Sequence, residues 1–113
     1  MKNLIILIAF VAFGFTNNAI AQKKVETTFK VDGVCGMCKK RIETAMDIKG
    51  VSFAEWNKET SDLFVVYNPK KVSEDELHRL LNEAGHDTEK SKATNEQYNS
   101  INGCCRYREM EKH

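Results

Sequence analysis

The chain has 113 residues, a formal net charge of +1 and four cysteines. This length allows one domain with a modest core. The near-zero net charge gives no indication of a nucleic-acid partner or of an anionic membrane surface as a partner.

The first segment is predicted to be a cleaved signal peptide. Met1 to Asn3 supply a positive charge, Leu4 to Phe15 form an almost unbroken apolar run, and Ala19 to Ala21 place small residues at the spacing that signal peptidase reads. The run is shorter than the ~20 apolar residues of a membrane-spanning helix, which disfavours a permanent anchor. Removal of residues 1–21 would leave residues 22–113 as an exported chain, periplasmic or secreted.

A strand and a helix are predicted next. Residues 25–31 alternate apolar and polar side chains and are rich in β-branched residues, which is typical of a strand. Asp32-Gly33 interrupts this pattern. From Met37 onward apolar residues recur at helical spacing, and Gly50 is well placed to end the helix. The apolar face of this helix consists of Cys38, Ile42, Ala45 and Met46.

Two more strands and a second helix follow. Residues 51–56 and 63–67 are strand candidates joined by a polar loop. Ser73 with Glu76 is a capping-box signature, and the helix that it opens ends at Gly85. The apolar positions of that helix are Leu77, Leu80, Leu81 and Ala84, and residues 86–89 are predicted to form a last, short strand.

The order strand, helix, strand, strand, helix, strand predicts an α+β fold. Such a chain packs two helices on one face of a four-stranded antiparallel sheet, the ferredoxin-like βαββαβ sandwich. We assign residues 22–90 to this domain. Residues 91–113 are predicted to be a polar C-terminal tail, because they are too poor in apolar groups to form a core of their own; one helical turn is expected before Gly103.

The chemistry of the chain is predicted to lie at Cys35 and Cys38. In an exported chain an even number of cysteines usually indicates disulfides, but a Cys35–Cys38 disulfide would close a very small ring and stabilise little. The two residues flank a predicted helix start, where free N–H groups and the helix dipole favour thiolates. Residues 39–41 add positive charge nearby, either as a solvated helix face or as a docking patch for an acidic partner.

The segment Val31 to Glu43 resembles the metal-binding segment of heavy-metal-associated domains. These domains occur in copper chaperones, at the amino termini of copper ATPases and in periplasmic mercury-binding proteins. Further matches are Ile42-Glu43, Gly50-Val51, Val65 to Pro69 and Ala84 to Asp87. The resemblance covers about residues 25–90 and implies the same fold as the order of elements does.

One departure from the family pattern concerns the loop before Cys35. The family commonly has Gly-Met-x there, with the methionine buried beneath the metal loop, whereas this chain has Asp32-Gly33-Val34 and carries its methionine at Met37. The packing beneath the loop before Cys35 is therefore expected to differ from that in the family. Met37 is expected either to pack under the loop or to lie at its surface.

The predicted cargo is a soft metal ion. Two thiolates suit a two-coordinate soft ion such as Cu(I) or Hg(II), whereas a structural zinc site generally needs four protein ligands. The resemblance places copper first and mercury second, with zinc open if further ligands join.

Three further residues are candidate additional ligands. His86 is either a ligand near the metal loop, as the resemblance allows, or a solvent-facing side chain. Cys104 and Cys105 lie outside the matched segment. They are expected to lend thiolates to the same metal, to form disulfides with Cys35, Cys38 or another molecule, or to act as a capture site on a flexible arm.

Other conspicuous residues have structural interpretations. Met46 is predicted to be a core residue because it falls on the apolar stripe of the first helix. Trp56 and Phe53 are predicted to be sheet residues, and a partly exposed Trp56 would join an interface. His78 and His113 are predicted to be exposed.

The favoured function is soft-metal binding and transfer by a monomer that is not an enzyme. The expected acceptor is a metal-transporting ATPase or an assembling cuproprotein, and a scavenging role in metal resistance uses the same site. The alternative is a thiol–disulfide oxidoreductase, with Cys35 attacking and Cys38 resolving. The chain lacks the length and strand order of a thioredoxin fold, and its one proline, Pro69, belongs to a turn before the second helix.

Overall fold

The computed structural model describes residues 23–109. The predicted signal peptide and His113 lie outside the described residues. Within that range no helix combines the length and the apolar character needed to cross a membrane.

The sheet has three antiparallel strands in the order β1-β3-β2. Every second residue of the central strand, from Leu63 to Tyr67, points into the core, as the period of two predicts. Phe29 and Trp56 from the two outer strands both lie opposite Leu63. The strands are β1 (Val25–Lys30), β2 (Val51–Trp56) and β3 (Asp62–Tyr67).

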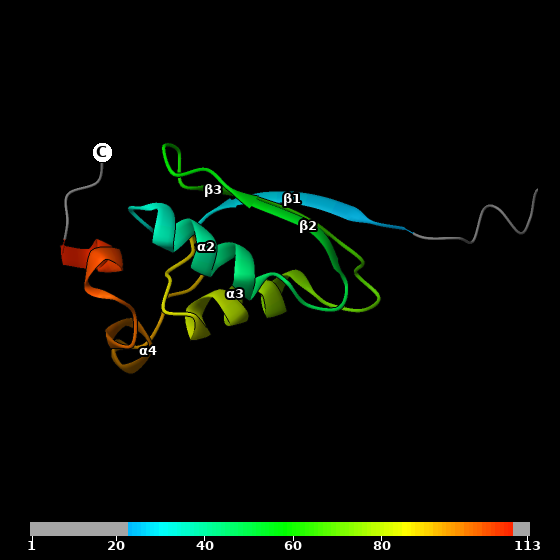
Figure 1. Cartoon of the computed structure of the whole chain (residues 1–113). Coiled ribbons are helices and arrows are strands. Elements are labelled where there is room, and N and C mark those ends of the chain that lie inside the picture. Colours follow the sequence, from blue (N-terminus) through cyan, green and yellow to red (C-terminus); the bar gives the residue numbers. More distant parts are fainter. Residues whose placement is uncertain (1–22, 110–113) are drawn as a thin grey trace, which may run out of the picture.

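Helices α2 (Gly36–Ala45) and α3 (Glu74–Glu83) lie on the same side of the sheet (Figure 1). Ser73 caps α3 by accepting a hydrogen bond from the backbone N–H of Glu76 at 3.2 Å. The Glu76 carboxylate binds Arg79 instead of completing the predicted capping box. Both predicted helices are therefore present, within a residue or two of their expected starts.

The predicted fourth strand is reduced to one isolated bridge, between Val31 and Thr88. The backbone N–H of Lys30 donates to the side-chain carboxylate of Glu89 at 2.7 Å rather than to a neighbouring backbone carbonyl. The backbone N–H of Thr88 donates to the carbonyl of Ser91 at 2.8 Å, which turns the chain away. The described fold is thus similar to the ferredoxin-like sandwich, but the four-stranded sheet is not formed.

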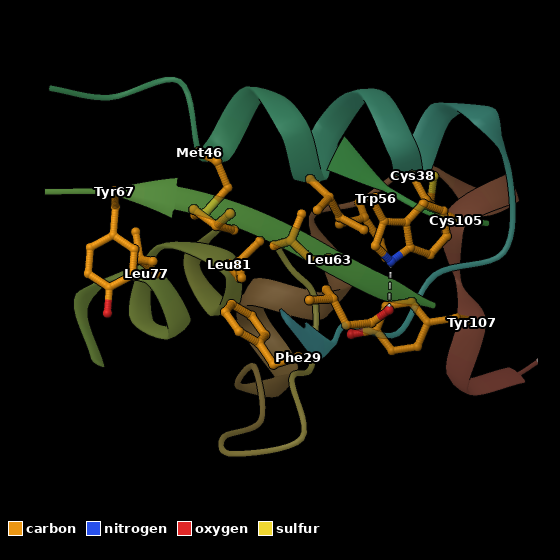
Figure 2. Close-up of a cluster of buried hydrophobic side chains, with 14 of the residues drawn as sticks. Phe29, Cys38, Met46, Trp56, Leu63, Tyr67, Leu77, Leu81, Cys105 and Tyr107 are labelled. Atoms are coloured by element: carbon orange, nitrogen blue, oxygen red, sulfur yellow. Dashed lines mark hydrogen bonds between the residues drawn. The ribbon is translucent and has the colours of Figure 1, made fainter. Parts of the chain in front are cut away.

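The core lies between the sheet and the two helices (Figure 2). Met46 is fully buried, as predicted from its place on the stripe of α2. Trp56 is also buried, so it is not available to an interface, whereas Phe53 on the same strand is half exposed. The fully buried large side chains include Ile42, Leu63, Val65, Leu77 and Leu81.

Residues 91–109, called the C-terminal segment below, pack against the domain instead of extending as a polar tail (Figure 1). The segment has no apolar stripe of regular period, but four of its side chains, Tyr98, Ile101, Cys105 and Tyr107, join the core of the domain. It consists of α4 (Asn95–Asn99) and two short 3-10 turns, Gly103–Cys105 and Tyr107–Glu109. Its buried residues are Ala93, Tyr98, Ile101, Cys105 and Tyr107.

His78 is buried, so the prediction that it is exposed was wrong. The turn that follows Thr88 covers it: Nδ1 of His78 lies 2.6 Å from Oγ1 of Thr88. Its ring also packs on Phe29, with centroids 4.1 Å apart. Burial lowers the pKa of His78, and the nearby Glu74 carboxylate opposes this only in part.

We expect the free energy of unfolding to decrease as the pH falls below the ordinary histidine pKa of 6.5. A histidine whose native pKa is lowered binds a proton more readily when unfolded. Its stabilising contribution is therefore full above 6.5 and is lost as the pH falls through the lower native pKa. Urea unfolding between about pH 5 and pH 8 measures this dependence. The variant His78→Gln should show a shallower pH dependence than the parent, and an unchanged slope would contradict the assignment.

Candidate metal centre

Cys35 and Cys38 stand at the start of α2. Cys35 is the N-cap residue, with extended backbone angles (φ −145°, ψ 177°), and Cys38 lies in the first turn. Their sulfur atoms are 3.7 Å apart. Cys38 is fully buried and Cys35 is partly exposed, so one side of the pair opens to solvent. The two predicted ligands are therefore close enough to bind one ion.

The local field favours the thiolate of Cys35. Burial acts to raise the pKa of Cys35, but hydrogen bonds from the backbone N–H of Cys38 and from the thiols of Cys105 and Cys38 outweigh it, and the pKa is lowered overall. The backbone N–H groups are those that the first turn of a helix leaves unpaired. A thiolate is the form that binds a soft metal.

Cys105 joins this pair, although it is about seventy positions away in sequence. Its sulfur lies 3.7 Å from that of Cys35. The sulfur atoms of Cys35, Cys38 and Cys105 all lie within 4.8 Å of one another. Cys105 is fully buried, and burial together with the neighbouring thiols raises its pKa.

Cys104 points away from this cluster. Its thiol is exposed and contacts the sulfur of Met37, 3.3 Å away, while its backbone carbonyl accepts a long hydrogen bond from the Cys35 thiol at 3.6 Å. Met37 itself is half exposed, so it lies at the surface of the loop rather than beneath it. Of the two neighbouring C-terminal cysteines, Cys105 therefore lies in the interior and Cys104 at the surface.

His86 is neither solvent-facing nor part of the three-sulfur cluster. It is fully buried, its Nδ1 lies 2.7 Å from the carbonyl oxygen of Asp32, and its ring stacks on Tyr107 with centroids 5.4 Å apart. Burial lowers the pKa of His86, and the Asp32 carbonyl opposes this only in part. His86 therefore ties the loop before Cys35 to the C-terminal segment.

Trp56 supports the metal loop from inside. A side chain at Gly33 would meet the Trp56 ring at 2.9 Å and the Cβ of Cys38 at 3.1 Å, so ring, loop and helix start are in close contact. The indole N–H donates to the carbonyl of Val31 at 3.0 Å (Figure 2). It also donates to the carbonyl of Ser61 at 3.2 Å. The sequence identified Trp56 only as a sheet residue, because nothing in its local pattern shows what packs on it.

Lys39 is engaged with the sheet rather than free. Its ammonium lies 2.5 Å from the Glu43 carboxylate and 2.9 Å from the backbone carbonyl of Trp56. The same carboxylate accepts the backbone N–H of Trp56 at 2.9 Å. Residues 39–41 were predicted to form a docking patch or a solvated helix face. Lys39 instead links α2 to β2, Arg41 is partly buried, and only Lys40 of the three is exposed.

Comparison of the sequence with models of protein families gave no match, and comparison with curated proteins gave none. Solved structures do match. The CopZ metallochaperone is 30% identical over 57% of this chain and 98% of its own, with a TM-score of 0.54. The N-terminal domain of a potential copper-translocating P-type ATPase from Bacillus subtilis, solved in the Cu(I)-loaded state, is 29% identical over 58% of this chain and 85% of its own (TM-score 0.56). Oxidised MerP from Ralstonia metallidurans is 25% identical over 58% of this chain and 94% of its own (TM-score 0.55).

Proposed function

The chain belongs to the heavy-metal-associated domain family, and we propose that it is an exported protein that binds Cu(I) through Cys35 and Cys38 and passes it on or sequesters it. The observation that carries the proposal is the pair of sulfurs 3.7 Å apart at the start of α2, one of them with a lowered pKa. Thiolates are soft ligands and select soft ions such as Cu(I).

The chemistry proposed is ligand exchange, and no bond of an organic substrate is broken. The exposed side of Cys35 allows the thiolate of an acceptor to approach the ion. Each sulfur of the acceptor replaces one sulfur of this protein, so the ion is never released to water. The protein is thus a binding protein rather than an enzyme.

The proposed acceptor is a metal-transporting ATPase or an assembling cuproprotein. Domains of a potential copper-translocating ATPase and a metallochaperone are among the similar structures, which supports a partner of this kind. Hg(II) is the second candidate cargo, since the same two thiolates suit it.

The proposal predicts that Cys35→Ser/Cys38→Ser loses at least about 1,000-fold in Cu(I) affinity. The reduced chain from residue 22 onward is titrated with Cu(I), Hg(II) and Zn(II) against a competing chelator, beside this variant. We expect soft metals to bind the parent at one ion per chain and Zn(II) to bind much more weakly.

A double variant that bound Cu(I) as tightly as the parent would overturn the proposed site. The oxidoreductase alternative has its own test, because it requires the parent to reduce insulin disulfides. We expect no such activity above that of free dithiol, and a rate comparable to that of a thioredoxin would contradict the proposal.

A further inference from the structure

We infer that Cys105 is a third metal ligand, supplied by the C-terminal segment, so that the ion is held by three sulfurs rather than two. The inference rests on the proposed function, since it places an additional ligand on the ion that Cys35 and Cys38 bind. Its starting observation is the cluster of the partly exposed Cys35 and the buried Cys38 and Cys105, with all sulfurs within 4.8 Å of one another.

The separations between sulfurs fit a three-coordinate ion better than a two-coordinate one. With metal–sulfur bonds of about 2.3 Å, two sulfurs on opposite sides of an ion are about 4.6 Å apart, whereas three sulfurs in a plane around it are about 4.0 Å apart. Cys35 lies 3.7 Å from both Cys38 and Cys105. The third separation, between Cys38 and Cys105, is within 4.8 Å. Adjustments of less than about 1 Å in these separations therefore suffice to form a trigonal site.

The position of Cys105 is fixed by contacts of its neighbours with the domain. The Tyr107 hydroxyl donates to the backbone carbonyl of Gly85 at 2.7 Å and accepts the backbone N–H of Asp87 at 2.8 Å. Its ring stacks on His86. Both hydrogen bonds are buried, so Tyr107 holds the segment two residues beyond Cys105 in one place.

A second anchor lies one residue further on. The guanidinium of Arg108 makes two hydrogen bonds to the Asp87 carboxylate, at 3.0 and 2.7 Å, and a third to the carbonyl of Ala93 at 2.7 Å. It also lies over the ring of Tyr98, 4.4 Å from the centroid. A two-point arginine–carboxylate pair fixes orientation as well as distance. The anchors thus preorganise the third sulfur at the site before any metal arrives.

The start of α2 offsets part of the charge of such a site, against the burial that raises the pKa of Cys105. When Cu(I) binds, the three thiols release their protons to solvent, and three thiolates with one Cu(I) leave two net negative charges. The unpaired N–H groups at the start of α2 point toward this charge.

A third resident sulfur changes how the ion leaves. Cys105 fills the third coordination position of the ion, which an acceptor thiolate that approaches at the exposed side of Cys35 would otherwise take. Transfer then requires Cys105 to withdraw, and with it part of the C-terminal segment. We therefore expect slower transfer and tighter retention than a two-sulfur site would give.

The test is X-ray absorption of the Cu(I)-loaded chain at one ion per monomer. We expect three sulfur neighbours in the parent and two in Cys105→Ser, with a loss of about 10- to 100-fold in Cu(I) affinity. Transfer to a chelator should be faster from Cys105→Ser than from the parent. Cys104→Ser is the matched control one position away, and it should keep three sulfurs and the parent affinity, because Cys104 points out of the cluster.

Two sulfur neighbours in the parent, with unchanged affinity in Cys105→Ser, would overturn the inference while leaving the proposed function intact. Failure of the proposed function would be recognised separately, because Cys35→Ser/Cys38→Ser would then bind Cu(I) as tightly as the parent. Cys105→Ala is measured in parallel, and circular dichroism of each variant shows whether it is folded. If both substitutions of Cys105 unfold the chain, the sulfur count of the parent alone decides.

Discussion

Trp56→Ala is expected to lower the free energy of unfolding by about 3–5 kcal/mol. The side chain is 1% exposed, and its removal leaves a cavity beneath Gly33 and Cys38. It also leaves the carbonyls of Val31 and Ser61, the first of them in a buried hydrogen bond, without the indole N–H. Since domains of this size are stable by about 5–15 kcal/mol, the loss is a large fraction of the total.

Urea unfolding followed by circular dichroism measures this loss, because Trp56 is the sole tryptophan and cannot report on its own removal. Trp56→Phe retains most of the ring volume but not the N–H, and about 1–3 kcal/mol is expected. Phe53→Ala is the control on the same strand, since Phe53 is 50% exposed, and its loss should stay below about 1 kcal/mol. Equal losses for Trp56→Ala and Phe53→Ala would contradict the supporting role of the indole.

Gly85→Ala is expected to destabilise the chain by about 2–5 kcal/mol and to loosen the C-terminal segment. Gly85 has φ +99°, a conformation that residues with a side chain rarely adopt. An added Cβ would overlap Cγ2 of Ile101 and would lie 3.0 Å from the backbone oxygen of Gln97. Either the helix α4 moves outward or the turn at Gly85 distorts. If Cys105 is a ligand, Cu(I) affinity falls as well.

Gly50→Ala separates the loss of stability from the loss of Cu(I) affinity. Gly50 has a similar φ of +102°, but its added Cβ would meet only the side chains of Lys71 and Val72, at 3.0 and 3.1 Å. We expect Gly50→Ala to lose stability by urea unfolding while retaining the metal affinity of the parent. Equal effects of the two substitutions on metal binding would show that the contact of Ile101 with Gly85 does not position the site.

The sequence was sufficient for the elements whose patterns are local. The alternation in β3 and the apolar stripe of α2 are repeated over several residues, so each position supports the others. Cys35 and Cys38 could be recognised for the same reason, because their spacing and the helix start lie within one short segment. Local pattern therefore predicted the three strands of the sheet, both main helices and the first two candidate ligands.

What the sequence did not reveal depends on contacts between distant segments. The fourth strand stops after one bridge because a Glu89 carboxylate takes the Lys30 N–H, and no propensity encodes that choice. His78 sits beside the predicted stripe and is buried by the turn at Thr88. The C-terminal segment was predicted to be a polar tail because its apolar residues, such as Ile101 and Tyr107, do not recur at the spacing of a helix or a strand.

The docking of the C-terminal segment has a consequence for competing thiols. Because Cys105 is tethered to the same chain and its Sγ lies 3.7 Å from that of Cys35, it acts at an effective concentration of at least about millimolar. A small thiol in solution must exceed that concentration to take its place. A protein partner that displaces Tyr107 and Arg108 from Gly85 and Asp87 removes the competitor altogether. The C-terminal segment thus excludes small thiols below about millimolar concentration from the ion, but not an acceptor protein that binds where the segment docks.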